Sequence, residues 1–165
     1  MNTIEKRAGG WRWLLLSAFV VLVDQLSKAY IARHYSEFEF TRVLPVLDIT
    51  RMQNVGAAFS LLASASGWQR WLFIALALGV SVAITIWLVR MRSDSGRLLA
   101  AGLALVLGGA IGNVIDRIRL GSVIDFIHFH WNQAYFPAFN LADSAITIGA
   151  GLLLLDALLD SRRKH

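Results

Sequence analysis

The sequence predicts an all-α membrane protein, a four-helix transmembrane bundle that carries a small extracytoplasmic β-platform. Hydrophobic residues make up 56% of the 165 positions and charged residues only 16%, whereas a soluble domain carries nearer a quarter charged residues. The apolar residues also gather in four stretches, each about long enough to cross a hydrocarbon core of ~30 Å as a helix. We therefore expect residues 1–165 to form a single polytopic membrane domain.

The four predicted helices follow from these stretches, which run roughly over residues 13–32, 71–89, 98–118 and 142–159. The first stretch follows Lys6 and Arg7 and could be mistaken for a cleaved signal peptide. It lacks a small-residue cleavage site, however, and Asp24 interrupts it. We interpret it as a retained helix.

Basic residues predict the orientation of the helices. They cluster before the first helix, between the second and third, and after the fourth, as Lys6, Arg7, Arg12, Arg90, Arg92, Arg97, Arg162, Arg163 and Lys164. With four crossings these clusters fall on one side, which the positive-inside rule assigns to the cytoplasm. Both termini are then cytoplasmic. The net charge of +5 thus reflects membrane topology, and we expect no nucleic-acid partner.

The segment 36–68, on the opposite side, has the pattern of β-structure. Polar and apolar residues alternate from Glu37 to Val43, which is the period of a strand, and residues 44–50 are again rich in β-formers. We expect a small sheet on the outer leaflet. It is bordered by the aromatic residues of a membrane interface, Trp68, Trp71, Trp131, Tyr135 and Phe136.

Polar side chains from four separate regions reach one level near the predicted outer interface. They are Asp24, Lys28, Asn54, Asn113, Asp116, Arg117, Asp125 and Asp143. Because such groups are costly inside transmembrane helices, their shared depth predicts one polar pocket.

Several of these residues also fit structural roles. Asp24 and Lys28 are four positions apart, hence on one helix face, and can neutralise each other. Arg117 could snorkel to the interface. Gly108 and Gly112 have the spacing of a close helix contact.

Other motifs are equally ambiguous when taken alone. Asn140, with Asp143 three residues later, has the pattern of a helix cap, and Asp125 could be an interface acid paired with an arginine. His128 and His130 alternate as a metal pair might on a strand, but no third ligand is evident. The chain has no cysteine, which excludes disulfides, thiolate metal sites and a cysteine nucleophile.

Five segments taken in order favour one interpretation. They read DQLSK at 24–28, NVGAAF at 54–59, GNVIDR at 112–117, GSVIDF at 121–126 and FNLADS at 139–144. Together they resemble lipoprotein signal peptidase (signal peptidase II), and the resemblance spans nearly the whole chain.

The resemblance implies an aspartyl endopeptidase of the bacterial inner membrane, with its active site near the periplasmic face. Its reaction would remove signal peptides from diacylglyceryl-modified prolipoproteins by cleavage just before the lipidated cysteine. The catalytic pair would be Asp125 and Asp143. Supporting and substrate-binding residues would be Asp24, Lys28, Asn54, Gly56, Asn113, Asp116, Arg117, Asn140 and Ala142. The resemblance implies no metal or organic cofactor. Its partners would be lipid-modified prolipoproteins and membrane lipid, and we expect a monomer.

Two facing carboxyl groups can hydrolyse a peptide without further cofactors. Like charges ~3 Å apart cannot both ionise cheaply, so the pair shares one proton. The ionised partner takes a proton from water, while the protonated partner polarises the scissile carbonyl and helps the amine leave.

Three other functions remain open from the residues alone. A small proton- or ion-translocating protein would also carry intramembrane charges. It needs polar residues that reach both sides, however, and the inner half of the helices is nearly unbroken apolar apart from Asp156, Asp160 and some hydroxyl residues. A Ser–Lys peptidase would need Ser60 or Ser144 to approach Lys28. A non-enzymatic scaffold would leave the outward polar cluster without a purpose.

Overall fold

The computed structural model describes residues 9–56, 67–92, 96–132 and 134–163. Residues 57–59 of the second motif, and Ser60, lie outside this part of the chain. The elements are, in order, η1 Gly10–Trp13, α1 Leu14–His34, β1 Phe40–Leu44, β2 Leu47–Asn54, α2 Trp68–Arg90, α3 Arg97–Leu120, β3 Val123–Trp131, β4 Ala134–Tyr135 and α4 Leu141–Arg163.

Within the described ranges, α1 to α4 are long and apolar enough to cross a membrane. They coincide with the four predicted stretches, so the prediction of four helices long and apolar enough to span a membrane, together with a small sheet, is confirmed. The helices run past the predicted ends: α2 begins at Trp68 rather than at residue 71, and α4 ends at Arg163 rather than at residue 159. Apolar length alone misses these ends, because interfacial aromatic and charged residues continue a helix without interrupting its backbone hydrogen bonds.

Helix α3 is the centre of the bundle. Over an apolar stretch of 18 residues, 61% of the α3 residues are buried inside the protein. The corresponding shares for α1, α2 and α4 are 22%, 22% and 17%. Small residues allow the neighbouring helices to come close. A Cβ atom added to Gly102 would lie 2.9 Å from the carbonyl oxygen of Gly149 on α4, and one added to Gly108 would lie 2.8 Å from that of Ser17 on α1. The predicted close contact at Gly108 is therefore present.

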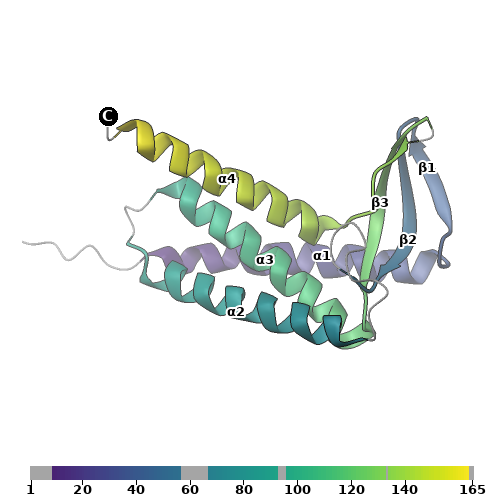
Figure 1. Cartoon of the computed structure of the whole chain (residues 1–165), viewed down its shortest axis with the longest axis horizontal. Helices are drawn as coiled ribbons and strands as arrows, with labels where there is room; N and C mark the ends of the chain where they lie inside the picture. The colour runs from purple at the N-terminus through teal and green to yellow at the C-terminus, as the bar shows by residue number, and fades with distance from the viewer. Residues whose placement is uncertain (1–8, 57–66, 93–95, 133, 164–165) are drawn as a thin grey trace, which may run out of the picture.

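The sheet stands across one end of the helices, and the C-terminus and the start of α1 lie at the other end (Figure 1). Within the described residues it has four antiparallel strands in the order β1-β2-β3-β4. The sheet was predicted from the segment 36–68, and β1 and β2 lie within it. The structure adds β3, which pairs with β2 so that Met52 lies opposite Asp125 and Asn54 opposite Val123.

A tight corner joins α3 to β3. Gly121 ends α3 with a left-handed φ of 84°, a conformation that suits glycine because it has no Cβ atom. Strand β3 starts two residues later. Near the start of β3, Ile124 and Phe126 pack on Ile31 of α1. The corner and this contact fix Asp125 beside the ends of α1 and α3.

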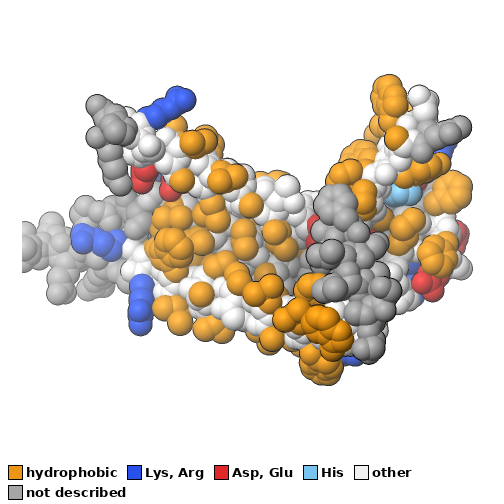
Figure 2. Space-filling model, viewed as in Figure 1, with side chains coloured by type: hydrophobic (Ala, Val, Ile, Leu, Met, Phe, Trp, Pro, Cys, Tyr) orange, Lys and Arg blue, Asp and Glu red, His pale blue; other side chains and the backbone are white. Residues whose placement is uncertain are grey.

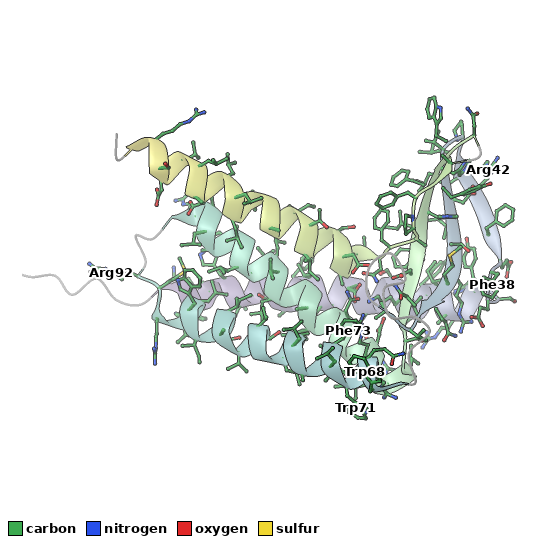
Figure 3. All side chains as sticks on the ribbon, in the orientation of Figure 1. Phe38, Arg42, Trp68, Trp71, Phe73 and Arg92 are labelled. Atoms are coloured by element: carbon green, nitrogen blue, oxygen red, sulfur yellow. The ribbon has the colours of Figure 1, made fainter. Side chains whose placement is uncertain are left out.

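The surface of the helices is rich in exposed apolar side chains (Figure 2), as expected for helices that face lipid. Trp68 and Trp71 lie near the sheet end of the bundle, and Arg92 lies at the opposite end (Figure 3). On the face shown in Figure 2, the molecule is hollowed between the helices and the sheet.

Candidate active site

Asp125 and Asp143 line one cavity between the sheet and the beginning of α4. Its volume is about 1020 Å³, which is ample for a peptide segment. Its polar lining includes Asn54, Asn113 and Arg117. Its remaining walls are mostly apolar or aromatic, among them Val55, Val123, Tyr135, Phe136, Phe139, Ile146 and Ile148. The cavity thus joins two acids to a largely apolar groove.

Two asparagine side chains connect the two carboxylates. Nδ2 of Asn140 donates to Oδ1 of Asp125 at 2.7 Å, and Nδ2 of Asn113 donates to Oδ1 of Asp143 at 2.8 Å. Nδ2 of Asn140 also lies 3.3 Å from Oδ1 of Asn113. Nδ2 of Asn54 adds a bond of 3.1 Å to the second oxygen of Asp125. Asn54, which the resemblance places among the supporting and substrate-binding residues, thus contacts an acid of the pair.

The start of α4 positions Asp143. Oδ1 of Asn140 accepts the backbone N–H of Asp143 at 2.9 Å, and Oδ2 of Asp143 lies 3.3 Å from the backbone nitrogen of Asn140. This reciprocal arrangement is a capping box, as the spacing of the two residues predicts. The cap also leaves Oδ1 of Asp143 directed to Asn113. One motif therefore both starts the helix and orients the carboxylate.

Lys28 is fully buried and donates to three acceptors. Its Nζ lies 2.9 Å from Asp24 and 3.0 Å from Asp116, and it donates to Oδ1 of Asn113 at 3.0 Å. An ammonium group has three donors, so all three are used. The predicted pairing of Asp24 with Lys28 is present. Lys28 does more than neutralise Asp24, because its third bond fixes the Asn113 amide with its nitrogen toward Asp143.

Arg117 and Gly56 form another edge of the site. The guanidinium of Arg117 donates to the carbonyl of Gly56 at 3.1 Å and lies over the ring of Phe73, 5.3 Å from its centroid. The backbone N–H of Gly56 in turn donates to Oδ1 of Asn54 at 3.0 Å. Arg117 therefore faces the cavity and holds the end of the β2 segment.

Burial dominates the electrostatics of Asp125. Its side chain is 3% exposed, and desolvation, followed by the charge of Asp143, raises its pKa from 3.8 to about 7. The hydrogen bonds from Asn54 and Asn140 act in the opposite direction. A carboxyl group with this pKa keeps its proton under mildly acidic conditions, in which an unperturbed aspartate would be ionised.

The two histidines contact residues other than the two acids. Nε2 of His130 lies 3.3 Å from Asp48, whose pKa is lowered chiefly by a hydrogen bond from Arg42. The ring of His128 stacks on Tyr135 with centroids 5.4 Å apart. Across the described ranges, no group of three or more metal-ligating side chains converges.

The other polar residues named from the sequence have local roles. The hydroxyls of Ser27 and Ser144 bond backbone carbonyls of their own helices, those of Asp24 and Asn140. Asp156 lies toward the C-terminal end of α4. At a rise of 1.5 Å per residue it is roughly 20 Å from Asp143 along the helix. Ser144 lines the cavity, but its hydroxyl donates to a backbone carbonyl and not to Lys28, and Asp156 lies far from the site.

Gln25 is a residue that the sequence did not single out. Its Nε2 lies 2.9 Å from Oδ1 of Asp116 and 3.2 Å from Oδ2 of Asp24. The available signal was its position as a polar side chain inside an apolar span, next to Asp24.

Comparison with known proteins gives a consistent result. A family model described as signal peptidase (SPase) II matches residues 16–159. A lipoprotein signal peptidase of Shewanella pealeana is 49% identical over 150 residues, covering 91% of this chain and 88% of that protein. One of Shewanella amazonensis is 48% identical over 151 residues, covering 92% and 89%.

Two solved structures, each described as a bacterial membrane enzyme, share the fold. The first has a TM-score of 0.82 and 32% sequence identity, and covers 93% of this chain and 92% of that one. The second has a TM-score of 0.76 and 33% identity, with 89% and 92% covered.

Proposed function

The chain belongs to the signal peptidase II family and removes signal peptides from prolipoproteins, and we propose that it does so as an aspartic peptidase with Asp125 and Asp143 as its catalytic pair. The observation that carries this proposal is the amide bridge between the two acids. Asn140 and Asn113 each donate to one carboxylate, and they lie 3.3 Å from each other. Such a bridge holds two acids at one cavity in a fixed orientation.

The pair activates water in this proposal. One proton is shared between the carboxyl groups, which titrate as a unit. The ionised group takes a proton from water, and the hydroxide forms a bond to the scissile carbonyl carbon. The protonated group donates its proton to the carbonyl oxygen. As the C–N bond breaks, the group that took the proton from water gives it to the departing amine, and the other group takes a proton back from the diol oxygen as the new carboxyl group forms. The raised pKa of Asp125, about 7, favours a shared proton near neutrality.

Asn54, Asn113, Asn140, Lys28 and Asp116 are positioning residues in this proposal. They orient the carboxylates and leave the chemistry to the pair. Because no metal or organic cofactor is required, chelators should leave the reaction intact. A Ser–Lys mechanism would require a serine near an uncommitted amine, whereas Lys28 already donates to three acceptors.

The substrate is a prolipoprotein whose cysteine carries diacylglycerol, and cleavage occurs just before that cysteine. The groove supports this assignment, since Phe136, Phe139, Ile146 and Ile148 line it beside the acids. Apolar walls suit both a signal peptide and lipid chains. Backbone of the substrate would be held by the guanidinium of Arg117, which faces the same cavity.

We place the site at the extracytoplasmic interface of the bacterial inner membrane, with both termini in the cytoplasm. The positive-inside rule supports this orientation, as does the position of Arg92 at the end of the bundle away from the sheet (Figure 3). The sheet then lies at the outer surface, and residues 1–165 act as one domain and as a monomer. A proton-translocating function is not favoured, since the relatives are peptidases.

Cleavage of a diacylglyceryl-modified precursor by purified protein in detergent tests the proposal. Mass spectrometry of the product should place the cut before the modified cysteine, with and without a metal chelator. Asp125→Asn and Asp143→Asn should each abolish cleavage, and Ser144→Ala should retain it. Near-normal turnover by either aspartate variant would overturn the aspartic mechanism.

A further inference from the structure

Each proposed catalytic aspartate follows a residue whose backbone N–H is bound by a buried acid. The N–H of Ile124, just before the first, donates to Oδ2 of Asp116 at 3.3 Å. The N–H of Ala142, just before the second, donates to Oδ1 of Asp24 at 3.0 Å. The positions of the two catalytic carboxylates therefore depend on where Asp116 and Asp24 lie relative to each other.

Two side chains of α1 bridge these acids. Lys28 reaches Asp24 at 2.9 Å and Asp116 at 3.0 Å. Gln25 reaches the same acids at 3.2 and 2.9 Å, and also the carbonyl of Gly112 at 3.2 Å. One ammonium faces two buried carboxylates, so the Gln25 amide supplies donors that the lysine cannot. We call Asp24, Gln25, Lys28 and Asp116 the clamp.

Gln25 occupies the outer side of the clamp. Its side chain is half-buried and lines a crevice of about 550 Å³ between α1, α2 and α3, separate from the cavity of the catalytic pair. The crevice is otherwise apolar except for Ser17 and Thr85, whose hydroxyls bond backbone carbonyls. A polar side chain at a lipid-facing crevice is costly unless its hydrogen bonds are made. The acceptors within reach of the Gln25 amide are the two acids and the carbonyl of Gly112.

We propose that Gln25 is a positioning residue that sets the separation of the two catalytic carboxylates by holding Asp24 and Asp116 together. The inference rests on Asp125 and Asp143 being the catalytic pair. Without the Gln25 amide, the two acids repel each other across one lysine. Their shift moves the backbone before each catalytic aspartate, and the carboxylates move apart.

A wider separation has two consequences for the reaction. A displacement of the order of 1 Å at a catalytic group can lower turnover about a hundredfold. Weaker repulsion within the pair also reduces their coupling, so the proton is lost at lower pH. Substrate binding is unaffected, because Gln25 lies outside the substrate groove.

Gln25→Met tests the proposal, since methionine has similar length, suits lipid and donates no hydrogen bond. Thr85→Val is the matched control: it removes a hydroxyl from the same crevice, but that hydroxyl bonds only its own helix. Steady-state cleavage of a diacylglyceryl-modified precursor is measured across pH with folded protein. We expect kcat of Gln25→Met to fall about tenfold or more at unchanged KM, and the high-pH limb of the profile to move to lower pH. Thr85→Val should match the parent in both.

A second variant keeps the proposal testable if Gln25→Met does not fold. Gln25→Asn keeps the amide but is one methylene too short to reach both acids, so it should show the same changes to a smaller degree. If Gln25→Met loses thermal stability but keeps the parent kcat and pH profile, Gln25 has only a structural role and the inference is overturned. Asp125→Asn and Asp143→Asn are run alongside. Should either of them remain active, the catalytic pair itself is wrong, which is a different result.

Discussion

The side-chain amide of Asn140 donates to the carboxylate of Asp125 at 2.7 Å, while its oxygen accepts the backbone N–H of Asp143. One side chain thus contacts both proposed catalytic residues. Asn140 is completely buried, so its bonds do not compete with water. Asn140 therefore couples the position of Asp125 to that of Asp143.

The two acids should act as one unit. Asp125→Asn and Asp143→Asn should each reduce cleavage to background, because either change leaves no shared proton. Residues that act together are strongly non-additive, so the double variant should be little worse than either single one. Single-turnover rates with the lipid-modified precursor check this. A double variant far slower than both singles would mean that the acids work independently.

Activity should depend on the protonation of the pair. With the pKa of Asp125 raised to about 7, one proton remains on the pair below that pH and is lost above it. We therefore expect kcat to fall as pH rises through about 7 to 8. The profile is measured with saturating precursor. A rate that stays constant to pH 9 would contradict the need for this proton.

The free energy of unfolding should also change as Asp125 loses its proton. The folded protein binds the proton on Asp125 more tightly than the unfolded chain, in which the pKa is 3.8. The free energy of unfolding is therefore highest below pH 3.8 as far as this group is concerned, and it falls as pH rises toward about 7. Unfolding in detergent should show this slope in the parent and a smaller slope in Asp125→Asn. Equal slopes would rule out a raised pKa in the folded state.

Loss of Lys28 should be more damaging than loss of the charge pair. Asp24, Asp116 and Lys28 carry a net charge of −1, from two carboxylates and one ammonium. Lys28→Ala leaves −2 in a buried place, which typically costs ~3–5 kcal/mol of stability. Asp24→Asn with Lys28→Met keeps −1 and should be milder. Urea unfolding in detergent compares them, and a double variant that is less stable than Lys28→Ala would show that charge balance is not the main effect.

Asn54 should be needed for cleavage more than for folding. Its amide donates to Asp125, and its oxygen accepts from Gly56. Asn54→Ala frees one oxygen of Asp125 and should lower kcat at least tenfold with little change in thermal stability. Gly56→Val should also impair cleavage, because Gly56 is buried and its carbonyl accepts from Arg117. Gly79→Val is the control, since a Cβ there meets nothing within 4 Å. Normal kcat in Asn54→Ala would make this segment a passive connection.

Local patterns account for the parts of the fold that the sequence predicted. Apolar length is a property of consecutive residues, so the four helices could be read directly. The i, i+4 spacing likewise predicted the Asp24–Lys28 pair, and the cap pattern predicted the bond between Asn140 and Asp143. These features need no knowledge of how distant segments pack.

Tertiary packing decides the remaining contacts. Lys28 reaches Asn113 on α3 only because α1 and α3 pack closely, and no spacing within either helix indicates it. Asn54 contacts Asp125 because the last part of β2 pairs with β3 in the register that puts Met52 opposite Asp125. Since a shift of one residue would turn Asn54 away from the acid, the sequence could not distinguish support of the pair from contact with substrate.

Gly112 should be the helix glycine to which catalysis is most sensitive. A Cβ atom added there would lie 2.6 Å from Oδ2 of Asp24 and 3.4 Å from Cβ of Ala142. Oδ2 of Asp24 is the atom that pairs with Lys28, so Gly112→Ala must displace either that acid or α1 as a whole. A side chain at Gly112 would therefore collide with the polar cluster, in addition to any effect on helix packing.

Gly112→Ala is expected to lower the cleavage rate at least tenfold and to reduce thermal stability by a few degrees. Gly151→Ala on α4 is the matched control, because a Cβ there meets nothing within 4 Å, and alanine favours the helix by up to about 1 kcal/mol. Its stability should be equal or higher, with the parent rate. A second comparison separates packing from positioning. Gly102→Ala would bring a Cβ within 2.9 Å of the carbonyl of Gly149, far from the acids, so it should lose stability while the folded fraction keeps its rate. If Gly112→Ala and Gly102→Ala lose activity only in proportion to unfolded protein, the displacement of Asp24 has no catalytic effect.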